Sequence, residues 1–187
     1  GAKFEDISSN DITWSDVDIP HDWLIYDTNN LYETGEGWYR KKFTLASDEL
    51  NGRRFSICFE GVYMNSTVYV NGAVAGEWKY GYSTFAFDIT ELLHSGENEI
   101  IVRVVHEAPN SRWYSGAGIY RNVWLTATSP SHLVTDGIYI VPRKDGELWN
   151  VEIDTEVVLA AGNEKGFVRQ TILDQDGQVI GKAEQEV

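Results

Sequence analysis

Cysteine and methionine occur only once each in the 187 residues, and proline occurs four times. The single cysteine, Cys58, excludes an internal disulfide, and the apolar run around it predicts a buried, inert thiol. No run of 18 apolar residues is present, so the sequence predicts no membrane-spanning helix. The start Gly1-Ala2-Lys3 lacks the charged and apolar regions of a signal peptide, and the sequence alone does not fix the compartment.

Basic residues are also scarce. Fifteen Lys and Arg stand against 29 Asp and Glu, which gives a formal net charge of −14 at pH 7. Such a charge repels phosphate backbones and anionic membranes, so we expect neither nucleic acid nor a membrane surface as a partner. A neutral partner such as a sugar fits better.

Helical periodicity is almost absent, and short runs rich in Val, Ile, Phe and Tyr recur between turn dipeptides, which is an all-β pattern. Asn71-Gly72 is the strongest hairpin signal, because a type I′ turn needs a positive φ at both central residues. The one helical turn that we expect is Thr90 to His94, with Thr90 as its N-cap. The expected strands are Trp38 to Ala46, Arg54 to Glu60, Ser66 to Val70, Thr84 to Ile89, Glu99 to Val105 and Ile119 to Ala127.

Alternation within the strands indicates stacked sheets. Phe55, Ile57 and Phe59 share one face, and the residues between them share the other. One buried and one wetter face is typical of a β-sandwich or jelly roll. Aromatic residues thin out after Ser129-Pro130-Ser131, so we predict one domain over residues 1–130 and a second over 131–187. The second domain holds about four strands, fewer than the roughly seven of an immunoglobulin-like sandwich. We therefore expect a truncated immunoglobulin-like domain.

The segment from Asn110 to Arg121 holds the highest concentration of side chains suited to ligand binding. It combines two cations, three aromatic residues and flexible glycines between two expected strands. Aromatic faces cover the apolar face of a pyranose, and Arg and Asn hydrogen-bond its hydroxyls. The same composition also suits a tight loop in which Trp113 and Tyr120 merely fill the core. Chemistry alone leaves both interpretations open.

Six motifs stand in a fixed order over residues 14 to 127. They are Pro20-His21-Asp22-Trp23, Gly37-Trp38-Tyr39-Arg40-Lys41, Phe59-Glu60-Gly61-Val62-Tyr63, Val68-Tyr69-Val70-Asn71-Gly72, Gly81-Tyr82-Ser83 and Ser111 to Arg121. In order and spacing this set resembles glycoside hydrolase family 2, and its last motif is most similar to that of bacterial β-galactosidases.

The resemblance implies a jelly-roll, galactose-binding-like domain, then an immunoglobulin-like domain, then a (β/α)8 barrel with two catalytic glutamates in a retaining mechanism. The barrel lies outside these residues, so we expect a fragment without catalytic residues or cofactor, inactive alone, from a carbohydrate-metabolising hydrolase. By the same resemblance, Arg112 donates hydrogen bonds to a β-galactoside. Asn110, Ser111 and Trp113 complete that substrate loop.

Other candidate sites are weaker. His21 and Asp22 could form an acid–base pair, but neighbours in an extended chain point to opposite faces, and in the family this motif is a structural turn. Solvated faces explain Glu33, Glu36 and Glu60. The histidines show no metal-ligand spacing, so we predict no protein-held metal.

The resemblance also implies a strand with a Trp-x-Phe element before Pro20, and only nineteen residues precede that proline. We expect this first strand to be missing, which leaves an unpaired sandwich edge that favours a homo-oligomer. Two further functions stay open: a free-standing carbohydrate-binding module, and a purely structural domain that docks on its own C-terminal barrel.

Overall fold

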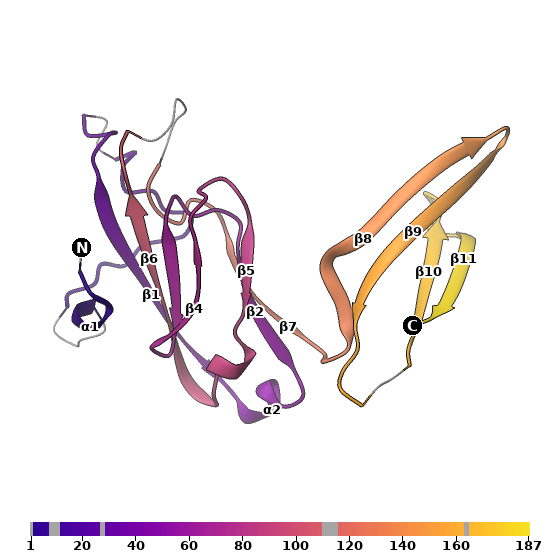
Figure 1. The fold of residues 1–187 in the computed structure, drawn as a ribbon, viewed down its shortest axis with the longest axis horizontal. Coiled ribbons are helices and arrows are strands. Elements are labelled where there is room, and N and C mark those ends of the chain that lie inside the picture. Colours follow the sequence, from indigo (N-terminus) through magenta and orange to yellow (C-terminus); the bar gives the residue numbers. More distant parts are fainter. Residues whose placement is uncertain (1, 8–11, 27–28, 110–115, 163–164) are drawn as a thin grey trace. The chain divides into compact units, whose positions relative to one another are not determined.

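The computed structural model of the chain describes residues 2–7, 12–26, 29–109, 116–162 and 165–187. Its regular secondary structure is almost wholly β-strand, so the all-β prediction is confirmed. The chain divides into two compact units, Gly1–Ala127 and Thr128–Val187. Figure 1 shows the strands of each unit. No helix in the described residues is long and apolar enough to cross a membrane.

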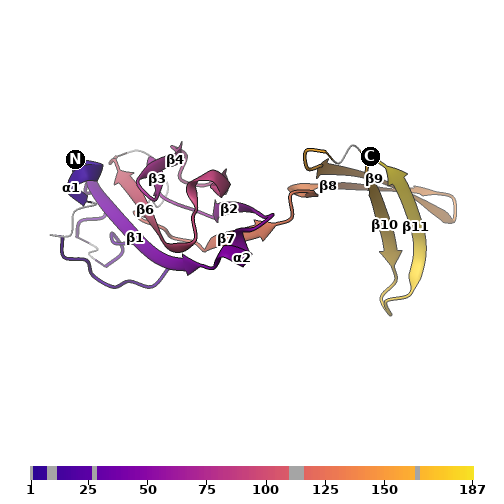
Figure 2. The same ribbon diagram turned by 90° about the horizontal axis from the view of Figure 1, so that it is seen from below.

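Two stacked sheets form the first unit (Figure 2). The four-stranded sheet has the order β1-β6-β3-β4, and the three-stranded sheet has the order β5-β2-β7. Their bounds are β1 Gly35–Leu45, β2 Arg54–Phe59, β3 Ser66–Val70, β4 Ala73–Trp78, β5 Phe85–Asp88, β6 Gly96–His106 and β7 Val123–Thr128.

The core lies between these sheets, where the inward faces of the strands meet. Phe55, Ile57 and Phe59 on β2 are all buried, as their alternation predicts, and they pack with residues of the opposite sheet such as Val68 and Val102. Cys58 points the other way and is half-buried. The prediction of a buried thiol is therefore wrong, because strand alternation places Cys58 on the outward face.

Local turn chemistry decides the β3–β4 hairpin. Asn71 and Gly72 adopt φ values of 49° and 85°, the two positive angles that a type I′ turn needs. The Asn71 side chain also donates to the backbone oxygen of Leu92 and to Asn98 Oδ1, each at 2.8 Å. The hairpin predicted at Asn71-Gly72 is confirmed, with β4 as its second strand.

The predicted helical turn is present, but its predicted N-cap is wrong. A 3₁₀ turn, η1, covers Thr90–Leu92, but Thr90 is its first residue and not its N-cap. The Thr90 hydroxyl instead accepts a hydrogen bond from the Phe55 amide at 2.8 Å, and Asp88 Oδ1 accepts the Thr90 amide. Two further helices, α1 at Phe4–Ile7 and α2 at Ser47–Leu50, were not predicted, because four residues are too few to show a helical period.

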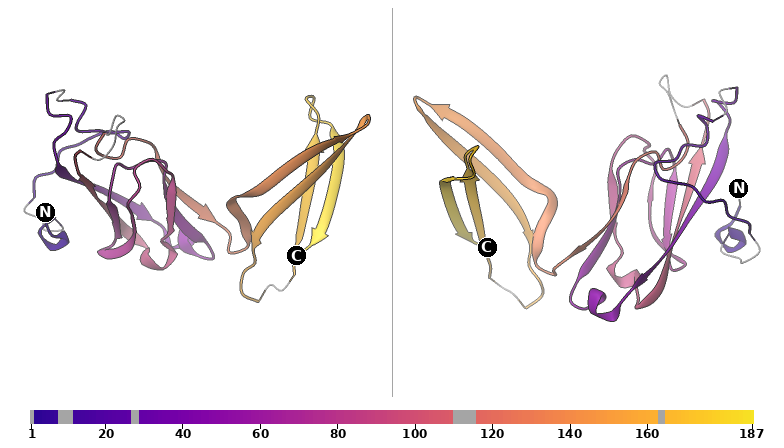
Figure 3. Two further views of the ribbon diagram at one scale, coloured as in Figure 1. Left: turned by 45° about the horizontal axis from the view of Figure 1, so that its top comes forward. Right: turned by 180° about the vertical axis from the view of Figure 1, so that it is seen from behind.

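The second unit consists of two hairpins (Figure 3). One pairs β8, His132–Asp145, with β9, Leu148–Val158, and the other pairs β10, Phe167–Leu173, with β11, Val179–Glu186. The Gln170 side chain on β10 donates to Thr155 Oγ1 on β9 at 2.9 Å and so links the hairpins. None of its described residues is buried, so this unit has no closed core of its own.

Candidate functional site

The predicted substrate loop joins β6 to β7. Its residues Asn110, Ser111, Arg112 and Trp113 lie outside the described residues, so their role stays a prediction. The structure does describe the stem that follows them, residues 116–122, and everything that holds this stem in place.

A buried carboxylate anchors the stem. Asp22, which is 8% exposed, accepts a hydrogen bond through Oδ1 from the Ala117 amide at 3.0 Å, and a second from the Leu24 amide at 3.0 Å. The backbone on either side adds more bonds: the Trp23 amide donates to Ala117 O at 2.9 Å, and the His21 amide donates to Ile119 O at 2.8 Å. The segment at residues 21–24 thus binds the stem as an added strand would.

The opposite side of the stem is bound by Tyr63. The amides of Gly118 and Tyr63 each donate to the other's carbonyl, at 3.0 and 2.9 Å, in an isolated antiparallel bridge. Gly118 has a φ of 132°, which side-chain-bearing residues rarely adopt. A Cβ there would come within 2.4 Å of Tyr39 Oη and 2.5 Å of His21 O, so glycine is required at this position.

His21 and Tyr39 complete this anchor. His21 Nδ1 lies 2.8 Å from Tyr39 Oη, and their rings meet edge to face with centroids 5.7 Å apart. Burial raises the pKa of Tyr39 to about 12, opposed by a hydrogen bond from the Ile119 backbone and assisted by the Asp22 carboxylate. The phenol is therefore neutral throughout the physiological range.

The Pro-His-Asp-Trp motif is thus explained without catalysis. The Asp22 carboxylate binds two backbone amides, while the His21 imidazole binds Tyr39. The two side chains serve different partners, in the structural role expected from the resemblance. Sequence reasoning missed that Asp22 reaches a loop 95 residues away, although its place beside a tryptophan in an extended segment hints at a structural carboxylate.

Glu36 was expected on a solvated face, but its carboxylate binds two side chains. Its Oε2 accepts a hydrogen bond from Arg103 at 2.7 Å, and its Oε1 accepts one from Trp38 Nε1 at 2.8 Å. Partial burial alone would raise the pKa of Glu36, but the bonds from Arg103 and Trp38 outweigh it and hold that pKa below its usual value. Glu60 likewise accepts hydrogen bonds from Asn122 and Trp124. No group of three or more His, Cys, Asp or Glu in the described ranges is placed to hold a metal.

Comparison with known proteins decides the family. The sequence model described as "Glycosyl hydrolases family 2, sugar binding domain" matches residues 2–130. The chain belongs to glycosyl hydrolase family 2. The family inferred from the six ordered motifs is confirmed.

Two family 2 relatives illustrate the likeness. A β-galactosidase of Bacteroides ovatus is 40% identical over 186 residues, which is 92% of this chain and 22% of that protein. A putative β-glucuronidase of Formosa agariphila is 35% identical over 183 residues, 91% of this chain and 17% of its own length. The chain thus spans about a fifth of these curated relatives.

Solved family 2 structures share the fold as well. A β-glycosidase from Bacteroides vulgatus superposes with a TM-score of 0.86 at 32% identity, covering 96% of this chain and 25% of that one. A β-glucuronidase from glycoside hydrolase family 2 superposes with a TM-score of 0.83 at 28% identity. Because both cover nearly this whole chain, the second unit also has its counterpart in these proteins.

Proposed function

We propose that this chain is the non-catalytic N-terminal portion of a retaining β-glycosidase that hydrolyses terminal β-glycosidic bonds, with β-galactosides as its substrates. The observation that carries the proposal is the match of residues 2–130 to the family's sugar-binding domain in a chain about a fifth as long as its relatives. The relative of 40% identity, named a β-galactosidase, favours galactosides over glucuronides.

The chemical step belongs to the rest of the parent protein. A retaining glycosidase needs an acid/base carboxylate and a nucleophilic carboxylate roughly 5 to 5.5 Å apart, and in the family both come from the barrel. The residues that follow Val187 in the parent reading frame test this assignment. We expect alternating β and α segments with an Asn-Glu pair after a strand, and a reading frame without them would contradict the proposal.

The substrate loop is the part of this chain that we expect to touch sugar. In this proposal Arg112 donates hydrogen bonds to galactoside hydroxyls, and Asn110, Ser111 and Trp113 shape the loop around it. The anchor formed by Asp22, Tyr63 and Tyr39 supports this role, because a stem that is already ordered lowers the entropy cost of holding the loop against a ligand.

The Arg112→Ala variant of the parent enzyme tests the loop. Losing a charged hydrogen bond made in the transition state costs about 1.5 to 3 kcal/mol, which lowers kcat/KM roughly 10- to 150-fold. Arg54→Ala is the matched control, because Arg54 forms a surface ion pair with the exposed Asp88. An unchanged kcat/KM in Arg112→Ala would favour the purely structural interpretation instead.

The domain division is also a proposal: a jelly roll over residues 1–130 and a truncated immunoglobulin-like domain over 131–187. A division of the chain after Ala127 supports the boundary. The exposed apolar residues of the second unit support truncation, because the β8–β9 hairpin leaves Leu133, Ile138 and Ile140 about half exposed. Further strands of the parent would bury this surface.

An opening in the first unit supports the proposed missing strand. A cavity of about 1110 Å³ reaches the core between β1 and β7, and both Phe59 and Val102 line it. Leu125 on β7 also lines it and remains 42% exposed. Residues Val123–Thr128 carry no charge and no proline, the features that usually protect an edge strand. A further strand paired along β7 would close the core.

A further inference from the structure

The N-terminal segment covers only part of the outer face of the four-stranded sheet. Phe4 of α1 stacks on Tyr69 with ring centroids 4.3 Å apart, and the Trp14 ring lies 4.4 Å from the Arg40 guanidinium. Tyr69, Ile101 and Arg40 form one row across the sheet, as their pairing shows. This row is covered.

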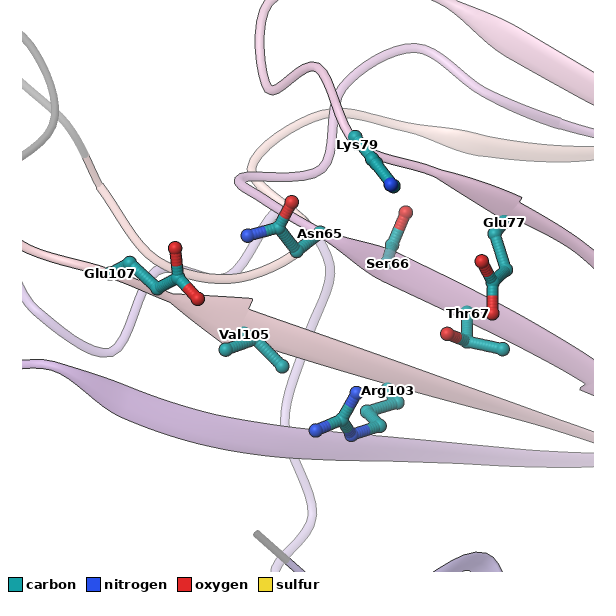
Figure 4. A pocket seen from close by; sticks show the side chains of 8 residues that line it. All are labelled: Asn65, Ser66, Thr67, Glu77, Lys79, Arg103, Val105 and Glu107. Carbon is teal, nitrogen blue, oxygen red and sulfur yellow. The ribbon is translucent and has the colours of Figure 1, made fainter.

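In the described part of the chain, the neighbouring row borders a cavity. Strand pairing aligns Trp38, Arg103, Thr67 and Glu77 across all four strands, and a cavity of about 440 Å³ lies over this part of the sheet. Figure 4 shows the side chains around it. We call this cavity the polar hollow; its polar lining comprises Asn65, Ser66, Thr67, Glu77, Lys79, Arg103 and Glu107.

Arg103 is fixed in place before any ligand arrives. Its Nη2 donates to Glu36 Oε2 at 2.7 Å, and its guanidinium carbon lies 5.9 Å from the centroid of the Trp38 ring. Glu36 is held in turn by Trp38 Nε1 and by the Ala2 amide. A guanidinium has five N–H donors, and the bond to Glu36 leaves several of them for another acceptor.

Three other groups of the polar hollow have unused bonding capacity. Within the described residues, the side chains of Thr67, Glu77 and Lys79 make no hydrogen bond or ion pair. They supply a hydroxyl, which both donates and accepts, a carboxylate acceptor and an ammonium donor. Thr67 is 8% exposed and lines the cavity. A ligand would therefore meet donors and acceptors side by side.

The charges of the polar hollow select for a neutral ligand. The lining holds the cations Lys79 and Arg103 and the carboxylates Glu77 and Glu107. Arg103 is also paired with Glu36, which lies outside the lining. A cation or an anion would each face a like charge within the lining. A ring of hydroxyls, each able to donate and accept, matches the mixed groups without leaving a charge unpaired.

We propose that the polar hollow binds a neutral pyranose unit of a glycan. This site goes beyond the proposed function, because it uses none of residues 110–113 and needs no other part of the parent. Thr67 and Glu77 would bond the sugar hydroxyls from β3 and β4, and Arg103 would bond them from β6. The volume of about 440 Å³ lies in the range of small-molecule sites.

Titration of the isotope-labelled 187-residue chain with methyl β-D-galactopyranoside, followed by amide NMR, tests the proposal. We expect saturable shifts centred on the amides of Thr67 and Glu77. Thr67→Val and Glu77→Gln should each weaken binding about fivefold, the equivalent of one hydrogen bond of about 1 kcal/mol. Thr44→Val and Glu97→Gln are the matched controls on β1 and β6 and should bind as the wild type does.

Methyl β-D-glucuronide is the charged probe. We expect it to bind more weakly than the galactoside, because its carboxylate would lie near Glu77 and Glu107 while Arg103 is already paired with Glu36. Three results would overturn the proposal: no saturable shift with up to about 50 mM galactoside, unchanged affinity in both hollow variants, or binding that survives in them but is lost in Arg112→Ala. Hydrolysis by the parent enzyme is a separate readout, so failure of this site and failure of the proposed function can be told apart.

Discussion

Replacement of Asp22 by alanine should loosen the stem of the substrate loop. The Asp22 carboxylate accepts the amides of Ala117 and Leu24, both at 3.0 Å, and is 8% exposed. Hydrogen bonds to a charged group contribute about 1.5 to 3 kcal/mol each, and alanine leaves both buried amides without a partner. Because neighbouring backbone bonds remain, we expect the lower end for each, about 3 to 4 kcal/mol in total.

Urea unfolding followed by tryptophan fluorescence measures the loss in stability, and amide exchange locates it. Exchange at Ala117 should accelerate together with exchange at Leu24, since both amides lose the same acceptor. Asp22→Asn keeps an acceptor oxygen without the charge, so about 1 to 2 kcal/mol should be lost. Asp18→Ala, an exposed change in the same segment, is the control. If Asp22→Ala unfolds within about 0.5 kcal/mol of the wild type, with unchanged exchange at Ala117, the anchor plays no such role.

Three further substitutions test the stem anchor and the Glu36 contacts. Gly118→Ala should lower the free energy of unfolding in urea by about 2 kcal/mol or more, because its Cβ would clash with Tyr39 Oη at a φ of 132°. Gly52→Ala has open space around it and should cost about 1 kcal/mol. Equal losses in the two variants would contradict this. In an ultraviolet titration Tyr39 should ionise near pH 12. Its folded pKa lies above the unfolded value of about 10, so its stabilising effect is present below pH 10 and lost towards pH 12, and Tyr39→Phe should remove that part of the alkaline loss. Glu36→Gln should lower the free energy of unfolding by about 1 kcal/mol at neutral pH, as measured in urea. The pKa of Glu36 is lower in the folded state than in the unfolded state, so the ionised carboxylate stabilises the fold fully above the unfolded pKa. This stabilisation is lost as the pH falls through the folded pKa, and the difference between Glu36→Gln and the wild type should shrink there.

Local patterns predicted the sandwich well because strand alternation and turn chemistry are encoded in neighbouring residues. Ser66 to Val70 was predicted to the residue, and Asn71-Gly72 fixed the following hairpin. The strand expected from Ile119 begins only at Val123, because the backbone of Gly118 and Ile119 bonds to Tyr63 and His21 rather than to a sheet. That partnership spans about 55 to 100 residues, and no local pattern reveals it.

The polar hollow was missed for a similar reason. Its residues come from β3, β4, β6 and the turns beside them, and only the strand register brings Arg103, Thr67 and Glu77 into one row. Alternation tells which side of a strand faces the core, but it does not tell which residues of different strands lie opposite each other.

Hydrolysis of a chromogenic β-galactoside, measured in parallel for the 187-residue chain and for the parent protein, tests the central claim most directly. The claim is that this chain supports substrate selection and leaves the bond-breaking step to a barrel beyond it. We expect turnover by the parent and none by the highly purified chain at the same molar concentration. Turnover by the chain alone, or a parent that cleaves no β-galactoside, would contradict it.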